Sequence, residues 1–314
     1  MAWIVGIDEA GYGPNLGPLV QAAVALSLPD SDPSGWDCLR PWVRRAAEPV
    51  DHRLCLDDSK KIYHGAQGFR RLEEGVFAAL GWSAGPLDER LASLLDADLR
   101  EELSKEHWYQ STERLPLHSN LICEPRWPDW WQPGPVAVNL VTTPRFNQMV
   151  NRARSKATVL AAGLIHLLQI MQQAIPRQSP EAGKSEPVLV FCDKQGGRNQ
   201  YAPMLQAAFP EGWVITERES AAESRYRITG LDRDWCIVIT PRADASGVAV
   251  AVASMLAKYL REVCMLQMNR FWRQHLPQIQ PTAGYPVDAR RFLAEIRPLL
   301  VTLNLAEEAI WRVK

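Results

Sequence analysis

Four carboxylates follow apolar runs of this sequence, and their spacing suggests that they belong to one site. They are Asp8, Glu9, Asp193 and Asp244. Runs rich in β-branched residues are typical of strands buried on both faces, and sites in α/β sheets form beyond strand ends. Carboxylates gathered there would repel one another unless divalent cations lay among them. Oxygen ligands favour Mg²⁺ or Mn²⁺, and two such ions suit in-line displacement at a phosphodiester.

Two further stretches could serve such chemistry. After Glu9 the chain has glycines at 11, 13 and 17 and prolines at 14 and 18, so the backbone can turn sharply and approach a ligand closely. Asp57 and Asp58 precede Lys60 and Lys61 at a predicted loop-to-helix junction. Plainer interpretations also exist. Asp8 and Glu9, before the first stretch, could be ordinary turn residues, and the charged residues of the second stretch could form a solvated surface.

The elements that must position these residues alternate between strands and helices. Apolar runs predict five strands, at residues 3–7, 19–26, 136–141, 188–192 and 235–240. Helical spacing predicts helices over residues 69–80, in a long stretch from Pro144, over 244–262 and from Asp288 onward. This alternation predicts an α/β fold in a single domain over residues 1–314, with residues 268–314 as a helical extension.

Residues 85–134 are predicted to be an insertion within that domain. The segment ends in a Pro- and Trp-rich stretch that contains Trp127, Trp130 and Trp131. Such a cluster could stack on nucleobases. Alternatively, aromatic residues between prolines fold back onto their own domain.

The composition limits the class of protein. The hydrophobic content of 46% and charged content of 23% over 314 residues are globular values. We expect no membrane span, because no uncharged apolar stretch of sufficient length stands out. The six cysteines have no C-x-x-C spacing, which favours reduced thiols in a cytoplasmic protein. The net charge of −1 implies that any nucleic acid is bound by local basic clusters.

Three motifs, taken together, resemble a known family. The segment Gly6-Ile-Asp-Glu-Ala-Gly-Tyr-Gly-Pro-Asn-Leu-Gly-Pro-Leu-Val20 is similar to the opening signature of type 2 ribonucleases H (HII and HIII). Asp58-Ser-Lys-Lys61 resembles the second motif of that family, and the segment from Asp244 to Lys258 resembles its last acidic motif. The strand that ends in Asp193 and the Gly284-Tyr285-Pro286 element fit the remaining positions, in the same order.

The resemblance implies a ribonuclease H-like fold, with a five-stranded mixed sheet flanked by helices. It implies that Asp8, Glu9, Asp193 and Asp244 are catalytic ligands of two divalent ions, Mg²⁺ or Mn²⁺. The implied activity is endonucleolytic cleavage of RNA in RNA–DNA hybrids, or at ribonucleotides embedded in DNA, with 5′-phosphate and 3′-hydroxyl products. A monomer is expected.

The resemblance also assigns substrate contacts. The backbone of the loop Gly11, Tyr12 and Gly13 would contact the 2′-hydroxyl that distinguishes RNA from DNA. Lys60 and Lys61 would hold phosphates, and Tyr285 would stack on a sugar, with a core tyrosine as the structural alternative. Ser254 and Lys258 could serve either structure or substrate.

The sequence departs from the family pattern at two positions. Tyr12 stands where the family usually has Arg or Lys, so a cation is missing for which Lys194 or Arg198 could substitute, and Ser246 stands where a lysine is common. These departures, with the insertion, keep two alternatives open: a nuclease of the same fold with a changed nucleic-acid substrate, and a non-catalytic nucleic-acid-binding protein.

Overall fold

A seven-stranded mixed sheet forms the centre of the computed structural model, which describes residues 1–110, 113–118, 127–176 and 187–313, without the side chain of Asp244. The strand order is β7-β2-β1-β8-β11-β10-β9. The strands are β1 (Ala2–Ala10), β2 (Leu19–Leu28), β7 (Pro133–Val141), β8 (Val188–Asp193), β9 (Trp213–Glu219), β10 (Ser224–Thr229) and β11 (Trp235–Thr240). Strands β1, β8 and β11 run parallel, and the other neighbours pair antiparallel.

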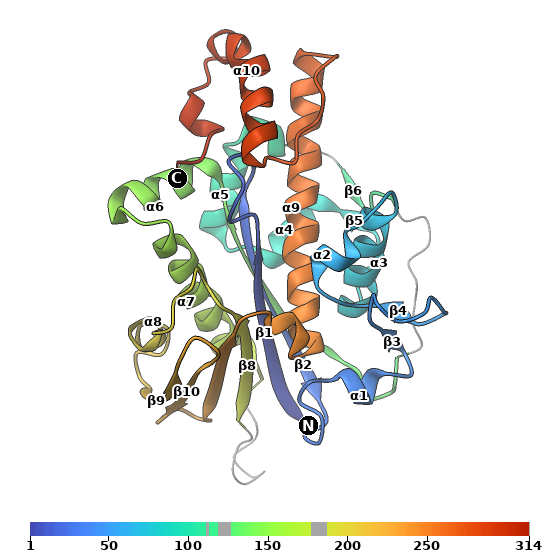
Figure 1. Ribbon diagram of the computed structural model, residues 1–314, viewed down its shortest axis with the longest axis vertical. Coiled ribbons are helices and arrows are strands. Elements are labelled where there is room, and N and C mark those ends of the chain that lie inside the picture. The colour runs from blue at the N-terminus through green and yellow to red at the C-terminus, as the bar shows by residue number, and fades with distance from the viewer. Residues whose placement is uncertain (111–112, 119–126, 177–186, 314) are drawn as a thin grey trace.

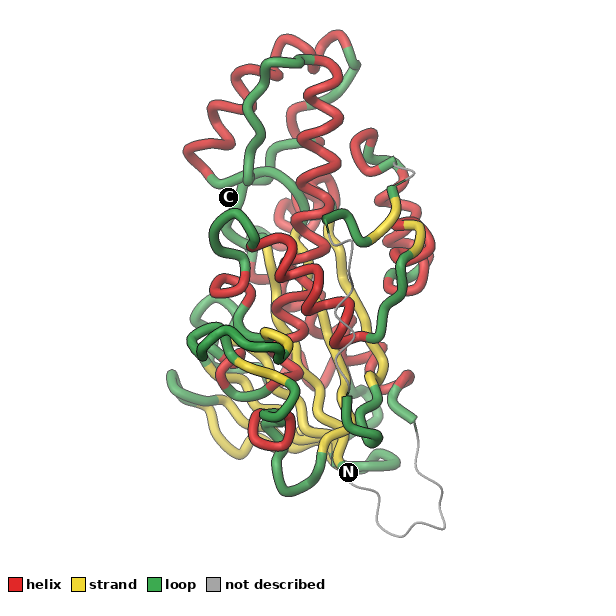
Figure 2. Tube along the Cα trace, turned by 90° about the vertical axis from the view of Figure 1, so that its right-hand side faces the viewer, coloured by secondary structure: helices red, strands yellow, loops and turns green. Residues whose placement is uncertain are grey.

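Helices cover both faces of this sheet (Figures 1 and 2). The helices are α1 (Trp36–Leu39), α2 (Ser59–Ile62), α3 (Gly68–Leu80), α4 (Leu87–Leu94), α5 (Ala97–Ser104), α6 (Thr143–Ala153), α7 (Ala157–Ala174), α8 (Ala202–Ala208), α9 (Val248–His275) and α10 (Pro286–Thr302). Single 3₁₀ turns are η1 (His107–Tyr109), η3 (Ala243–Ala245) and η4 (Glu307–Ala309), and short ladders join β3 (Val43–Arg44) to β4 (Leu54–Cys55) and β5 (Gly85–Pro86) to β6 (Arg114–Leu115). The predicted α/β class, with a mixed sheet flanked by helices, is confirmed.

The central strand β1 separates two apolar cores. Ile4 belongs to the core under α3 and the first half of α9, whereas Val5 and Ile7 belong to the core under α7 and α8. A strand buried on both faces needs apolar residues at successive positions, as the sequence predicted. The second half of α9 extends beyond the sheet and packs against α10 (Figure 1).

Gly6 lets α9 lie directly on β1. A Cβ atom at this position would come within 2.1 Å of the carbonyl carbon of Ala249 and 2.2 Å of the backbone nitrogen of Val250. Both atoms belong to the first turn of α9, so only a residue without a side chain permits this approach. The close contact fixes where α9 crosses the sheet, and therefore which of its residues reach the end of β1.

Two predictions about the elements need correction. The sheet has seven strands and not five, because the β9–β10 hairpin pairs with β11 and extends the five predicted neighbours. The helical stretch from Pro144 is two helices, α6 and α7, because Arg154 adopts the left-handed conformation (φ 55°) and ends α6. The predicted C-cap at Gly81 is confirmed, with φ of 62°.

One helix of the described chain is long and apolar enough to cross a membrane by length and composition. It is α7, which carries no Asp, Glu, Lys or Arg, so the expectation that no such stretch exists was wrong. In this fold, however, Leu164, Leu168 and Met171 are buried in the core beneath the sheet. The same test is passed by the core helices of soluble proteins.

The tryptophans of the 85–134 segment lie against the main core. The rings of Trp127 and Trp131 stack at 4.3 Å between centroids, and Trp127 Nε1 donates to the Ala78 carbonyl of α3 at 3.1 Å. Trp131 is buried. The structure therefore matches the alternative in which these residues fold back onto their own domain. The predicted insertion and the extension at 268–314 stay predictions, although α9 itself continues past residue 268 to His275. Of the six cysteines, Cys123 lies outside the described residues and the other five are free thiols.

Candidate functional site

The register of the parallel strands brings two of the predicted carboxylates together. Ile7 of β1 pairs with Cys192 of β8, so the next positions, Asp8 and Asp193, are neighbours at the ends of these strands. On the other side of β8, Asp193 pairs with Thr240 of β11. Because partners in adjacent strands point to the same face, Asp8 and Asp193 share the face that α9 covers.

Asp8 is held by contacts from its own strand and from α9. The Glu9 backbone N–H donates to Asp8 Oδ1 at 2.8 Å, and the Ser254 hydroxyl of α9 makes a hydrogen bond with the same carboxylate. Ser254 is also 3.0 Å from the Ser59 hydroxyl of α2. This chain of contacts joins β1, α9 and the D-S-K-K motif, and it gives Ser254 a positioning role.

Burial raises the pKa values of both Asp8 and Glu9. For Asp8, loss of solvation is the largest cause and outweighs the hydrogen bonds from Ser254 and Glu9, while the negative charges of Asp193 and Asp58 raise the pKa further. For Glu9, burial is again the largest cause, followed by the charges of Asp8 and Asp193; Lys60 opposes them. The hydrogen bonds and positive charge around these two carboxylates therefore do not make up for the solvation that their ionised forms lose on burial.

Asp193 connects the strand ends to the turn that carries the fourth predicted carboxylate. Asp193 Oδ1 accepts a hydrogen bond from the backbone N–H of Ala243 at 3.2 Å, which holds η3 against the end of β8. The backbone of Asp244 lies in this turn, and its side chain is outside the described part of the structure. Asp8, Glu9 and Asp193 thus lie together, with the backbone of Asp244 beside them.

The donor atoms available here suit a hard divalent cation. All are carboxylate oxygens, and the pKa values of Asp8 and Glu9 are raised because nearby positive charge is insufficient, a deficit that Mg²⁺ or Mn²⁺ would correct. Among the described side chains, which exclude that of Asp244, no three His, Cys, Asp or Glu residues are grouped closely enough to hold a metal ion. A complete coordination shell would thus need a further ligand.

The glycine loop, residues 11–17, is held in place by hydrogen bonds from the C-terminal segment. The Arg312 Nη2 atom donates to the carbonyl oxygens of Gly11 and Pro14, and the Arg312 backbone N–H donates to Asn15 O at 2.8 Å. From another side, the Asn15 N–H donates to Gly284 O at 2.8 Å. This loop therefore joins the end of β1 to two segments near the C-terminus.

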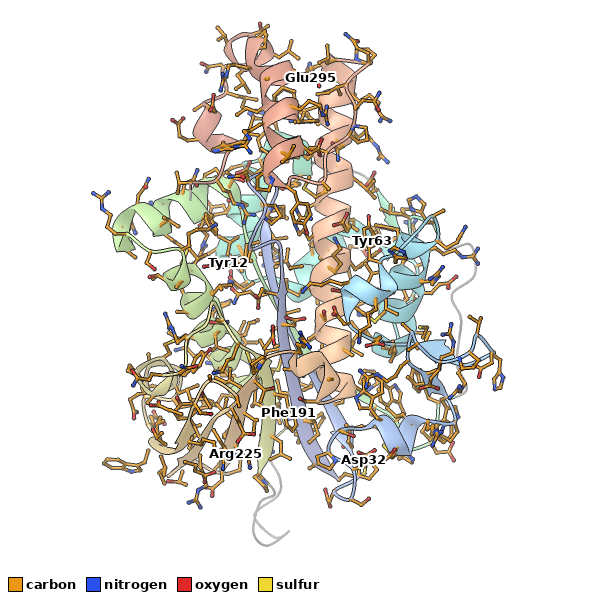
Figure 3. All side chains as sticks on the ribbon, in the orientation of Figure 1. Tyr12, Asp32, Tyr63, Phe191, Arg225 and Glu295 are labelled. Carbon is orange, nitrogen blue, oxygen red and sulfur yellow. The ribbon has the colours of Figure 1, made fainter. Side chains whose placement is uncertain are left out.

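Tyr12 packs against the apolar cluster of α6 and α7 (Figure 3), and burial together with the nearby Glu9 charge raises its pKa. The Lys156 ammonium lies 5.1 Å from the centre of its ring, and Arg198 is close enough to influence its pKa, which burial raises. Lys194 instead donates to Asn199 Oδ1 and Ser220 O. Of the two cations expected to substitute for the missing basic residue, Arg198 is near Tyr12; Lys156 is a further cation that sequence reasoning did not single out for this role.

The two lysines of the D-S-K-K motif have different surroundings. Asp58 caps α2 by accepting from the Lys60 N–H at 2.9 Å, and Lys60 is exposed near Glu9. Lys61 Nζ forms an ion pair with Asp57 Oδ1 at 2.9 Å. Asp57 is buried and also accepts from the Ala46 N–H. Lys60 is thus exposed beside the carboxylates, whereas Lys61 contributes to holding this turn together.

Tyr285 is exposed, with 53% of its surface accessible, which disfavours the alternative of a core tyrosine. Its ring centre lies 6.0 Å from the guanidinium of Arg261, a buried α9 residue that donates to Ala283 O at 2.9 Å. Arg261 also donates to Glu262 Oε1, which binds the Lys258 ammonium. Lys258 is therefore engaged in an ion pair within the fold.

The arginines at the glycine loop are the functional candidates that sequence reasoning missed. Arg261 and Arg312 are each only 1% exposed. Neither lies in a motif, and a lone arginine near a helix or near the end of a chain gives no signal in a single sequence. Only the folded chain brings them to residues 11–17.

Comparison with known proteins gives matches among solved structures alone. No family model matches, and no curated protein matches. Type 2 ribonucleases H are among the matching structures. Ribonuclease H2 from Pyrococcus horikoshii is 16% identical, with 98% of this chain and 92% of that chain covered and a TM-score of 0.46. RNase HII in a PCNA complex from Archaeoglobus fulgidus is 17% identical, with 99% of this chain and 94% of that chain covered and a TM-score of 0.43. Bst-RNase HIII in complex with Mn²⁺ is 16% identical, with 99% of this chain and 66% of that chain covered and a TM-score of 0.43. At these identities, function has to be argued from the site residues themselves.

Proposed function

We propose that this protein is a metal-dependent endoribonuclease of the type 2 ribonuclease H kind, which cleaves the RNA strand of RNA–DNA hybrids. The observation that carries the proposal is the meeting of Asp8, Glu9 and Asp193 at the ends of β1 and β8, beside the turn that holds Asp244. The sequence motifs that resemble the family contain these same residues. The reaction adds water across the P–O3′ bond and leaves a 5′-phosphate and a 3′-hydroxyl.

Each side chain would have a distinct role in such a reaction. Asp8, Glu9, Asp193 and Asp244 would hold two divalent ions, Mg²⁺ or Mn²⁺. When bound, these ions supply an activated water and stabilise charge on the phosphate and the leaving oxygen. Ser254 keeps the Asp8 carboxylate in place, and the Ala243 N–H does the same for Asp193. Lys60, near Glu9, would attract a phosphate of the nucleic acid.

The glycine loop provides a basis for choosing RNA. Gly11, Tyr12 and Gly13 follow the two carboxylates after one alanine, Ala10, and Gly13 is exposed. Backbone N–H groups of such a loop can donate to a 2′-hydroxyl, the group that distinguishes RNA from DNA. Tyr285, exposed on the Gly284 turn that is bonded to the same loop, would stack on a neighbouring sugar. The proposal includes a monomer that acts in the cytoplasm.

Cleavage of two labelled duplexes tests the proposal. One duplex carries a single embedded ribonucleotide and the other is a long RNA–DNA hybrid, each assayed in Mg²⁺ and in Mn²⁺. We expect the wild-type protein to cut at ribonucleotides, and the Asp8→Asn variant to lose cleavage while keeping its fold. Asp129→Asn, at an exposed position remote from the carboxylates, is the matched control and should cut normally.

Each outcome has a clear meaning. Cutting at the lone ribonucleotide supports action at RNA–DNA junctions, and cutting of the long hybrid alone supports specificity of the HIII kind. If the wild-type protein cuts neither duplex but cuts another nucleic acid, the alternative of a changed substrate holds. Retained cleavage in Asp8→Asn contradicts the proposed site, and absence of any cleavage or metal binding favours a non-catalytic binding protein.

A further inference from the structure

Arg312 lies beneath the glycine loop as a buried guanidinium. Its side chain is 1% exposed, and its Nη2 atom donates to the carbonyl oxygens of Gly11 and Pro14. The guanidinium also lies 4.8 Å from the centre of the Phe146 ring. It therefore binds two carbonyls of the loop that follows the catalytic carboxylates.

This guanidinium is costly for the fold. Within the described residues no carboxylate pairs with it, and its Nε and Nη1 atoms have no hydrogen-bond partner there. Burial, followed by the charge of Arg261, lowers the pKa of Arg312 to about 9. A buried charge without a carboxylate partner is generally less stabilising than an apolar side chain of similar size. Packing alone therefore does not explain an arginine at this position.

The contact with Gly11 determines which way the adjoining amide points. In a trans peptide, the carbonyl oxygen and the following N–H lie on opposite sides of the bond. Because Arg312 binds the Gly11 carbonyl from the buried side, the Tyr12 N–H points away from Arg312. Among the described residues, no acceptor bonds this N–H. It is an unpaired donor two residues from Ala10, where β1 ends.

The segment that carries Arg312 is itself fixed to α6. The Asn147 side chain of α6 donates to the carbonyl oxygens of Glu308 and Trp311, at 2.9 and 2.8 Å, and accepts from the Val313 N–H at 2.8 Å. Asn15 of the loop and Arg312 exchange a further pair of contacts through their backbone and the Asn15 amide. Arg312 is thus held in place from outside the loop that it contacts.

We propose that Arg312 is a positioning residue for ribonucleotide recognition: it holds the Gly11 carbonyl so that the Tyr12 amide N–H faces the 2′-hydroxyl of the substrate. This inference rests on the proposed function, because the 2′-hydroxyl matters only to a protein that selects RNA. It adds a residue that lies outside every motif of the chain. The role is carried out through the backbone, so Tyr12 needs no basic side chain for it.

The first experiment measures how strongly binding depends on the 2′-hydroxyl. Fluorescence anisotropy, with Ca²⁺ in place of Mg²⁺, gives Kd for a duplex with one ribonucleotide and for the same duplex with a deoxyribonucleotide there. We expect the wild-type protein to prefer the ribonucleotide by about tenfold, the value of one hydrogen bond. In Arg312→Met this preference should fall to nearly one. Arg297→Met is the matched control, because Arg297 is an exposed arginine of α10 that pairs with Glu307, so the same positive charge is lost without touching the loop.

The second experiment follows the loop without any substrate. The Asn15 and Leu16 amides both donate to Gly284 O, at 2.8 and 3.3 Å, so they exchange slowly only while the loop is held. Hydrogen exchange measured by mass spectrometry should be at least about tenfold faster over residues 10–18 in Arg312→Met than in wild type or Arg297→Met. Unchanged exchange would overturn the inference.

The two measurements separate this inference from the proposed function. Faster exchange together with loss of the 2′-hydroxyl preference supports the inference. Faster exchange with the preference retained overturns it, because the loop would then recognise RNA without Arg312. If the wild-type protein itself shows no preference for the ribonucleotide, the inference is overturned, whereas cleavage of the long RNA–DNA hybrid would still support the proposed function. Exchange then decides whether Arg312 holds the loop.

Discussion

The substitution Gly6→Ala tests whether the contact between β1 and α9 positions the site. The new Cβ atom would lie 2.1 Å from the Ala249 carbonyl carbon, whereas ordinary contact begins at 3.4 Å, so α9 must move by about 1.3 Å. We expect the clash to cost about 3 kcal/mol or more, because backbone atoms must shift. The lost chain entropy of glycine offsets up to about 1 kcal/mol. The net loss of unfolding free energy is about 2 kcal/mol or more.

The same movement should reduce activity. Ser254, which contacts Asp8, lies on α9, and η3 directly precedes that helix. A displacement of about 1 Å at a catalytic group can lower the rate by about a hundredfold. We would measure urea denaturation and hybrid cleavage for Gly6→Ala beside Gly85→Ala, a control position with no heavy atom within 4 Å of the new Cβ. If Gly6→Ala unfolds at the wild-type urea concentration, the reasoning about this contact is refuted.

Three further predictions concern the carboxylates and the 85–134 segment. Because burial raises the pKa of Asp8 from 3.8 to about 7, its ionisation destabilises the fold, so metal-free protein should lose stability as the pH rises from about 4 to about 7; urea denaturation should show Asp8→Asn losing about 1–3 kcal/mol less, and an equal loss would contradict the burial argument. Glu73 accepts the Leu117 and His118 N–H groups at 2.6 and 2.8 Å; Glu73→Ala should lower the free energy of unfolding by about 2–4 kcal/mol, and a change near zero would show that these contacts contribute little. Trp127→Ala should lower the melting temperature without changing Kd for a hybrid, and weaker binding would instead support base stacking.

Local rules were sufficient for most of the elements. The five predicted strands are present and are consecutive neighbours in the sheet, because apolar runs buried on both faces leave little choice of structure. The break at Arg154 was not predictable, since a left-handed arginine has no signature in a helical pattern. The β9–β10 hairpin was also missed. Its exposed strand β9 has no buried apolar run, and its place in the sheet comes from pairing with β10.

Some residues of the candidate site were predicted from the sequence, and others were recognised only in the folded chain. Asp8, Glu9 and Asp193 were found because a carboxylate after a buried strand stands out in the sequence, and the pairing of β1 with β8 brings them together. Lys61 was predicted to hold phosphate, yet it forms an ion pair with Asp57, a contact that depends on how the preceding turn folds. Nothing near Arg312 in the chain indicates its contact with Gly11.

The sequence by itself determined the α/β class, the strand ends and the carboxylates of the proposed site, because these depend on the order of residue types along short segments. The tertiary structure decided which groups surround that chemistry. It placed Ser254 on Asp8, the turn of Asp244 on Asp193, and Arg312 under the glycine loop. Such contacts join residues far apart in the chain, and they arise from the packing of α9 on Gly6 and of the C-terminal segment on α6. A pattern read along the chain carries no information about that packing.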